Sequence, residues 1–313
     1  MSARPSAGDE LDEIAAWVQR LAALLSAGLE PLAALRAIES PPPVLAAAAE
    51  CDSPFDVADR ILAAAPVPAH PGAAAASGGR LAWSLVAAAW SVALDSGAPV
   101  AASLDRIATT LRSLADADRQ VDLAIAGPIA TARIVALLPL LGLALGLLVG
   151  SDPVGVLVGS VPGAAAGVVG VALLGAGLRW NRRVVAAARE SDPFAGLASD
   201  LVALALEGGG DPDRALELVG ASMQRCGIRG DLDEAVSTVA FARRAGVSVA
   251  ALLRTDAARM RRLALADALR RAALLGSRLL APLALCFLPS FVLLGVVPLM
   301  LGLLRGAVGA FIA

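Results

Sequence analysis

Two long apolar runs separated by a short polar break constrain this chain more than any other feature. The stretch 131–178 begins with TARIVALLP, stays apolar to Gly150, breaks at Ser-Asp-Pro over 151–153, and is apolar again to Leu178. Each run has about twenty residues or slightly more, the length that a helix needs to cross the hydrocarbon core of a bilayer. The pattern predicts a transmembrane helical hairpin over residues 131–178.

The glycines of this hairpin recur every four residues. They are Gly142, Gly146 and Gly150 in the first run and Gly155, Gly159, Gly163 and Gly167 in the second. Spacing by four places each set on one helix face, where small residues let two backbones approach closely. The spacing favours tight packing against the other arm or a second subunit. The alternative is that glycine and alanine are simply abundant in this chain.

The composition indicates a protein that is partly in the membrane and partly in water. Of its 313 residues, 58% are hydrophobic and 17% are charged. The mean hydropathy of +0.73 is too high for an ordinary soluble domain, whereas the charged share is too high for a protein wholly in lipid. The net charge of -2 provides no general basic footprint, so we expect no nucleic-acid partner.

Missing residue types exclude several kinds of chemistry. Every basic residue is arginine, so neither a Walker A sequence nor a Schiff-base lysine is possible. The only histidine, His70, lies in a segment rich in Ala, Pro and Gly, which indicates an exposed loop. The isolated Cys51, Cys226 and Cys286 are typical of buried apolar thiols, not of a disulfide framework. We therefore expect no enzymatic activity, no cofactor and no metal site.

Helical patterns precede the hairpin. Apolar residues at spacings of three and four follow residue 11 and predict an amphipathic helix that ends at Gly28. Pro31 suits the first turn of the next helix, and the sequence SPFD at 53–56 resembles another helix start. Residues 66–80 read as a loop. The apolar run 81–94 is too short to span a bilayer, so a buried bundle helix is expected there. A turn at 96–99 then leads into a long helix that reaches the hairpin.

Two arginine-rich segments orient the chain. Arginines cluster at 179–183 and 254–278 and are missing from 151–153, and the positive-inside bias then places both flanking helical regions in the cytoplasm. No secretory signal is evident at the N-terminus. A third apolar run at 279–304, which contains Pro282, Pro289 and Pro298, predicts a third, kinked span and an extracytoplasmic tail at 305–313.

The arginines of the second helical region permit two interpretations. A solvated face with positive-inside bias explains them, and so does a surface for a partner or for lipid headgroups. The candidates for such a surface are Arg254, Arg261, Arg262, Arg270 and Arg271.

A repeat relates the two helical regions. The segment 28–35 (GLEPLAAL) aligns with 209–216 (GGDPDRAL), and 97–104 (GAPVAASL) aligns with 246–253 (GVSVAALL). The turn residues of these motifs are Gly28, Pro31, Gly97, Pro99, Gly209, Pro212 and Gly246. In each half the second motif leads through a charged helix into a span, which signals repeated architecture.

We therefore expect an all-α integral membrane protein with two cytoplasmic helical-bundle domains and three transmembrane helices. The first domain covers residues 1–130, with an insertion at about 39–80, and precedes the hairpin at 131–178. The second domain covers 179–278 and is followed by the span at 279–304 and the tail.

These motifs resemble the type II secretion system F domain family. The segment 24–35 is similar to the family's opening helix and turn, and 130–141 is similar to the entry into the first span in its Flp/Tad pilus branch. The segment 243–253 and the last span, 283–300, also resemble that branch. The Pro-rich insertion at 39–80 departs from the compact family pattern.

The resemblance implies a non-enzymatic platform in the inner membrane. Its implied partners are a cytoplasmic hexameric secretion ATPase, prepilin or pilin subunits, a paralogous platform protein or a second copy of the chain, and the lipid bilayer. Such a platform couples the ATPase to extraction and polymerisation of pilins.

Two other functions compete with this interpretation. A small-molecule or ion transporter usually keeps ionisable groups within its spans, whereas Asp152 is the only charge between 134 and 178 and residues 279–304 have none. An intramembrane enzyme needs a nucleophile with its base, or a metal set, and neither is evident near the spans.

Overall fold

The structure is a computed structural model that describes residues 6–66, 74–148, 155, 159, 161–189, 195–228 and 230–300. It is helical, without a strand in these ranges, which confirms the expected all-α class. Gly150, the hairpin turn at 151–153, His70 and the tail at 305–313 lie outside the described residues.

The chain divides into two compact units. Unit 1 comprises Met1–Gln120 and Ser191–Ala266, and unit 2 comprises Val121–Glu190 and Asp267–Ala313. The helices α6 (Val100–Leu148) and α12 (Val249–Ala273) each have residues in both units.

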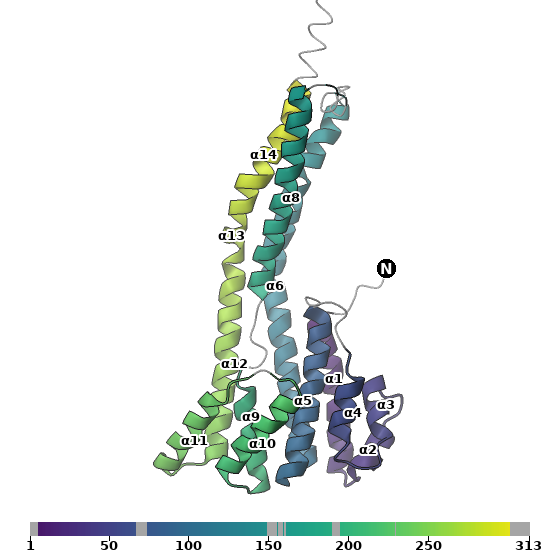
Figure 1. Ribbon diagram of the computed structural model, residues 1–313, viewed down its shortest axis with the longest axis vertical. Helices are drawn as coiled ribbons and strands as arrows, with labels where there is room; N and C mark the ends of the chain where they lie inside the picture. Colours follow the sequence, from purple (N-terminus) through teal and green to yellow (C-terminus); the bar gives the residue numbers. More distant parts are fainter. Residues whose placement is uncertain are drawn as a thin grey trace, which may run out of the picture. The chain divides into compact units, whose positions relative to one another are not determined.

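Unit 1 is built from short helices together with parts of α6 and α12 (Figure 1). In chain order these are α1 (Ala7–Ser26), α2 (Pro31–Arg36), α3 (Pro43–Ala49), α4 (Val57–Ala64), α5 (Ala74–Ser96), α9 (Leu197–Ala205), the 3-10 turn η1 (Leu206–Gly208), α10 (Pro212–Arg225) and α11 (Asp233–Ala245).

Local sequence explains where several of these helices begin. The hydroxyl of Ser6 accepts a hydrogen bond from Asp9 N at 3.1 Å, while Ser6 N donates to the Asp9 carboxylate at 3.2 Å. This capping box satisfies backbone donors at the start of α1. The helix predicted to start at 53–56 begins instead at Val57, because Ser53 Oγ accepts from Phe55 N at 3.3 Å and closes a turn. Of the expected loop at 66–80, residues 74–80 are helical, since α5 begins at Ala74, and residues 67–73 lie outside the described residues.

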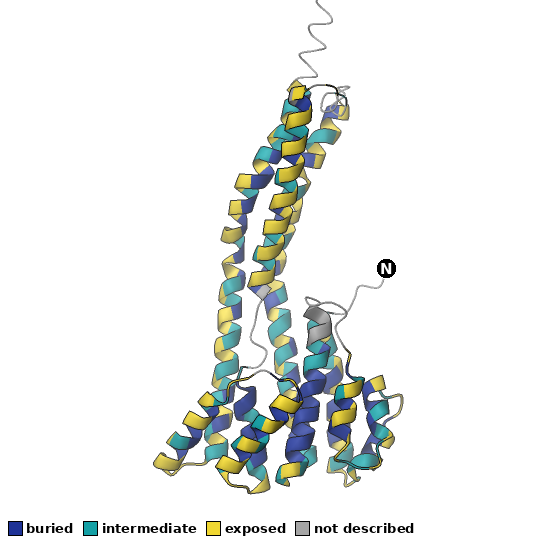
Figure 2. Cartoon of the chain, in the orientation of Figure 1, coloured by how far each residue is buried: buried dark blue, intermediate teal, exposed yellow. Residues whose placement is uncertain are grey.

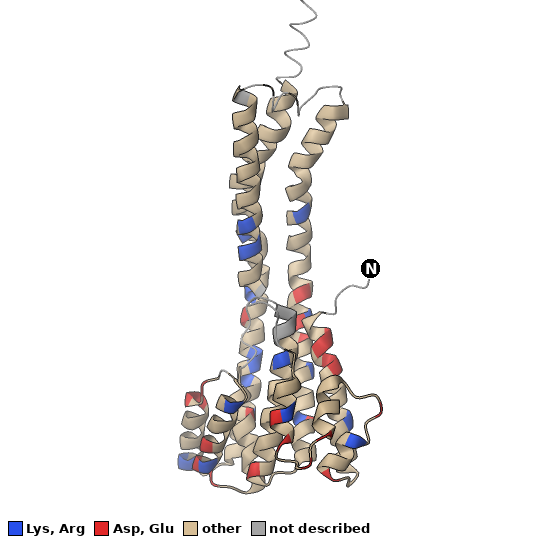
Figure 3. Cartoon of the chain, turned by 45° about the vertical axis from the view of Figure 1, so that its right-hand side comes forward, with Lys and Arg blue, Asp and Glu red and all other residues tan. Residues whose placement is uncertain are grey.

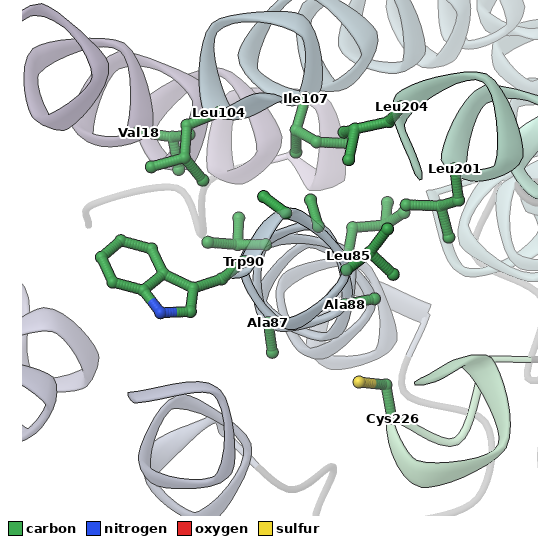
Figure 4. Packing of buried hydrophobic residues seen from close by; sticks show 14 of the residues in the cluster. Val18, Leu85, Ala87, Ala88, Trp90, Leu104, Ile107, Leu201, Leu204 and Cys226 are labelled. Atoms are coloured by element: carbon green, nitrogen blue, oxygen red, sulfur yellow. The ribbon is translucent and has the colours of Figure 1, made fainter. Parts of the chain in front are cut away.

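The helix α5 forms the centre of the unit 1 core. It contacts α1, α4, α9 and α10, and Figure 4 shows side chains from several helices gathered around it. Trp90 is fully buried, and its Nε1 donates to Pro54 O at 2.8 Å. The expectation that 81–94 is a buried helix is confirmed. Both expected helical regions contribute to this one core, for example through Leu104 and Leu201.

Unit 2 contains the C-terminal part of α6, α8 (Val161–Arg189) and a long C-terminal helix that continues from α12. This last helix comprises α13 (Leu275–Pro282), η2 (Leu283–Phe287), α14 (Leu288–Phe291) and η3 (Val292–Val296). The segments η2 and η3 are π-helical and follow Pro282 and Pro289, respectively. A proline removes one backbone donor and crowds the preceding turn, and a π-helical turn accommodates such a disturbance.

Three helices are long and apolar enough to cross a membrane: Val100–Leu148, Gly163–Ala188 and Val249–Met300. Their large apolar side chains are exposed over much of unit 2, so that exposed residues recur along these helices in Figure 2. The sequences 134–148, 163–178 and 279–300 contain no charged residue, and Figure 3 shows long tan stretches of ribbon. This surface is suited to contact with lipid.

Candidate functional site

The glycines of the repeat motifs occupy turns with left-handed backbone. Gly28, Gly97, Gly209 and Gly246 have φ values of 95°, 74°, 81° and 67°. A side chain is disfavoured at such φ, so glycine is the residue that ends these helices at low cost. Each turn joins two helices of unit 1, counting α6 and α12 by their first residues.

The residues after these glycines start the next helices. Pro31 and Pro212 are the first residues of α2 and α10, where the missing N–H of proline costs nothing. The Asp211 side chain also accepts from Asp213 N at 3.0 Å. Pro99 directly precedes α6, and its carbonyl accepts from Ser103 N at 3.0 Å.

Two of these turns pack directly against each other. A methyl group placed on Gly208 would lie 2.7 Å from Ser96 C and 3.1 Å from Ala98 N. The turn around Gly97 and the turn around Gly209 therefore approach at backbone distance. A turn of the first repeat thus contacts a turn of the second within one unit.

A cluster of charged side chains lies next to these turns. Glu207, on η1, forms ion pairs with Arg106 of α6 and Arg254 of α12. Asp200, on α9, forms an ion pair with Arg261 of α12. The side chains of Glu207 and Asp200 are only 17% and 19% exposed, so these two carboxylates are largely shielded from water, whereas Arg106 and Arg254 are 43% and 42% exposed. We call these five residues the carboxylate–arginine cluster.

Burial disfavours the charged form of Asp200 in this cluster. Desolvation raises the pKa of Asp200 above its ordinary value, and the nearby charge of Arg261 partly opposes this rise. The charges of Arg106 and Arg254 also act to lower the pKa of Asp200, less than the charge of Arg261 does. Removing one arginine would leave a carboxylate with less compensation, which is costly in a site shielded from water.

Three of the five candidate arginines of the second helical region form ion pairs with carboxylates. Arg254 and Arg261 belong to the cluster just described, and Arg271 pairs with Asp267 one helical turn earlier. Arg262 donates to Ala258 O at 3.2 Å and is exposed, as is Arg270. Of the five candidate arginines, Arg254, Arg261 and Arg271 thus pair with carboxylates, whereas Arg262 and Arg270 are exposed.

Part of the glycine set lies at close helix contacts in unit 2. A methyl group on Gly142 would lie 3.1 Å from Gly295 Cα and 3.1 Å from the Phe291 ring. Gly146 and Gly163 are buried, and Gly155 and Gly167 are half-buried. Gly159 is exposed, and a methyl group there would meet Gly155 O of its own turn at 2.6 Å.

The closest contacts of α8 involve glycines that the spacing by four did not select. A methyl group on Gly170 would lie 2.7 Å from Leu294 Cγ, and one on Gly177 would lie 2.9 Å from Cys286 Cβ. Ser290 Oγ also donates to Gly170 O at 2.9 Å, a buried hydrogen bond between helices. The third span is thus a packing partner of α8.

The buried residues of these helices follow a seven-residue spacing. On α8 they include Gly163, Gly170 and Gly177, and on α6 they include Ile125, Ala132, Pro139 and Gly146. Such a repeat keeps one seam facing a neighbouring helix. Reading the glycines at spacing seven would have found Gly170 and Gly177.

The described part of the chain contains no group of three or more His, Cys, Asp or Glu side chains that could hold a metal ion. Cys51, Cys226 and Cys286 are free thiols, and burial raises the pKa of Cys226. The carboxylate–arginine cluster therefore offers ion pairs that join α6, α9, η1 and α12, but no nucleophile paired with a base.

Comparisons with protein-family models, with curated proteins and with solved structures found no match to this chain.

Proposed function

We propose that this chain is a membrane platform protein of a secretion or pilus-assembly machine. In this role unit 1 faces the cytoplasm and binds a hexameric secretion ATPase. The apolar helices of unit 2 hold the chain in the cell membrane beside pilin subunits. The sequence resemblance to the type II secretion system F domain family motivates the proposal.

The observation that carries the proposal is the single core of unit 1. Both copies of the repeat contribute helices to it, and their turns meet at Gly208 and Ser96. From this core α6 and α12 continue, as helices, into the sequences of two apolar spans. A partner that moves unit 1 would thereby act on both helices at once.

The apolar spans support a scaffold better than a conduit. Transport of ions or polar solutes usually relies on ionisable groups within the spans. The charge-free sequences 134–148, 163–178 and 279–300 provide none. A transporter is therefore the alternative outcome of the test below.

Site-directed photocrosslinking of the full-length protein in its native membrane tests the proposal. A photoreactive residue at Phe241, which is 54% exposed in unit 1, should crosslink to the secretion ATPase. The matched position in unit 2, Leu141, is 59% exposed and should crosslink to lipid or pilin but not to the ATPase. Further probes at exposed Phe55, Arg214 and Arg244 would cover other faces of unit 1.

Two kinds of result would speak against the platform function. If no unit 1 position crosslinks to the ATPase, and the purified full-length protein does not bind it, the platform function is wrong. Solute uptake into vesicles that contain the protein alone would favour the transporter.

A further inference from the structure

Three arginines near the end of α8 differ from those of α12. Arg179, Arg182 and Arg183 are all exposed, and none of them forms an ion pair with any residue that the structure describes. Residues three and four apart lie on one side of a helix, so Arg179 faces the same way as the other two. Each guanidinium group presents several N–H donors in a planar fork that matches the geometry of a phosphate group.

The surroundings of these arginines combine charge with apolar surface. They line an open hollow of about 530 Å³ together with Gly175, Leu178 and Ala186. Gly175 has no neighbour within 4 Å of a methyl group placed on it, which leaves room above the helix backbone. Leu178, which lines the hollow, is 38% exposed, and Trp180, which follows Arg179 in the chain, is 41% exposed. The apolar sequence 163–178 leads directly into it.

This arrangement fits one kind of ligand. A guanidinium group binds phosphate oxygens through paired, charge-assisted hydrogen bonds. The exposed valines of α8, such as Val168 and Val171, provide the apolar surface on which acyl chains pack. Exposed tryptophan is characteristic of the level at which headgroups meet the hydrocarbon core.

We propose that Arg179, Arg182 and Arg183 form a binding site for the phosphate headgroup of an anionic phospholipid. The headgroup occupies the hollow, and the acyl chains follow the apolar face of α8. Unlike Arg254 and Arg261, whose charge carboxylates neutralise, these arginines keep their charge for the lipid. The site depends on α8 crossing a membrane and not on the ATPase partner proposed above.

Lipid-dependent quenching of Trp180 tests this site. The full-length protein is placed in nanodiscs that contain phosphatidylcholine and a small share of a lipid with brominated acyl chains, either phosphatidylglycerol or phosphatidylcholine. The fluorescence of Trp180 is obtained as the difference in tryptophan fluorescence between wild type and a Trp180→Phe variant. Each basic residue near an anionic surface favours it by about fivefold, so three arginines should make Trp180 prefer phosphatidylglycerol by on the order of 100-fold.

Matched variants assign the preference to the site. The triple variant Arg179→Gln, Arg182→Gln, Arg183→Gln should reduce the preference to within about twofold of one. The control Arg214→Gln, Arg225→Gln, Arg244→Gln removes the same charge from exposed positions of unit 1 and should keep it. Should the triple variant fail to fold, Arg182→Gln alone is expected to lower the preference by about fivefold.

Several results would overturn the site. The proposal is wrong if wild type shows no preference, if the triple variant keeps it, or if the control loses it equally. Millimolar inorganic phosphate added to the nanodiscs should leave quenching unchanged. Loss of quenching on adding phosphate would mean that the arginines bind the free ion and not a lipid.

Discussion

Unit 1 and unit 2 differ in how many of their large apolar side chains are exposed. In unit 1 the fully buried side chains include the large Trp90, Leu104 and Leu201. Unit 2 buries Phe287 and Gly170, but many of its large apolar side chains are exposed, such as Leu141 at 59% and Leu148 at 82%. The two arrangements are built from the same few apolar residue types, so composition alone does not distinguish them.

The difference reflects two solvents. Water drives large apolar side chains inward, because burial removes their surface from contact with it. Lipid tails exert no such drive, and helices there associate through close backbone packing and interhelical hydrogen bonds. The Ser290 bond to Gly170 O and the contact between Gly142 and Gly295 are of that second kind. Unit 1 is therefore organised for water and unit 2 for lipid.

The largest effect is expected in the core of unit 1. Replacing Trp90 by alanine should lower the free energy of unfolding by about 3–5 kcal/mol, because it opens a cavity and leaves Pro54 O without its donor. Chemical unfolding of the purified protein in detergent, followed by circular dichroism, measures this loss. Trp90→Phe should cost less, since it fills most of the cavity. A loss below about 1 kcal/mol for Trp90→Ala would contradict the assigned core.

Substitution by arginine at two similarly exposed positions, one in each unit, distinguishes a surface that faces lipid from one that faces water. Leu141→Arg should cost about 2.5–3.5 kcal/mol in membrane insertion, because its exposed side chain faces lipid. Phe55→Arg, at 63% exposure in unit 1, should change stability by no more than about 0.5 kcal/mol. The inserted fraction of each variant, measured in isolated membranes, provides the comparison. Equal insertion of both variants would mean that Leu141 does not face lipid.

Two glycines of α8, Gly170 and Gly175, differ in whether a neighbouring helix lies close to them. Gly170→Ala should destabilise unit 2 by about 1–3 kcal/mol, because the added methyl group would overlap Leu294. Gly175→Ala meets nothing within 4 Å and should be neutral or stabilise the helix by up to about 1 kcal/mol. Thermal unfolding in nanodiscs ranks the variants. The opposite order would show that α8 packs through another face.

Local chemistry made part of this structure predictable. The turns at Gly28, Gly97, Gly209 and Gly246 follow from the backbone freedom of glycine next to helix-starting residues. The buried helix α5 follows from an apolar run too short to span a bilayer. In both cases neighbouring residues contain the whole signal.

Contacts between distant residues were not predictable in the same way. The ion pair of Arg261 with Asp200 joins residues 61 apart, and only the folded helices bring them together. Gly170 and Gly177 do not belong to the glycine series spaced by four, and their contacts follow the seven-residue spacing of the buried residues of α8. The shared core of unit 1 depends on the pairing of α5 with α9 and α10, for which no single segment carries a signal.

The smallest expected effect is a difference between α1 of unit 1 and α8 of unit 2 in how their amide exchange responds to acid. Hydrogen bonds from Ser6, and then Arg119, hold the pKa of Asp9 below its ordinary value. A lowered carboxyl pKa contributes stability that is complete above the unfolded value of 3.8 and is lost as pH falls through the lower, folded value. Amide exchange in α1 should therefore accelerate below about pH 4, whereas exchange in the charge-free part of α8 should not respond. Asp9→Asn should weaken α1 at pH 7 and abolish the acid response at its N-terminus. An equal acid response in both helices would show that the capping carboxylate does not control the start of α1, and that the two units do not differ in acid sensitivity.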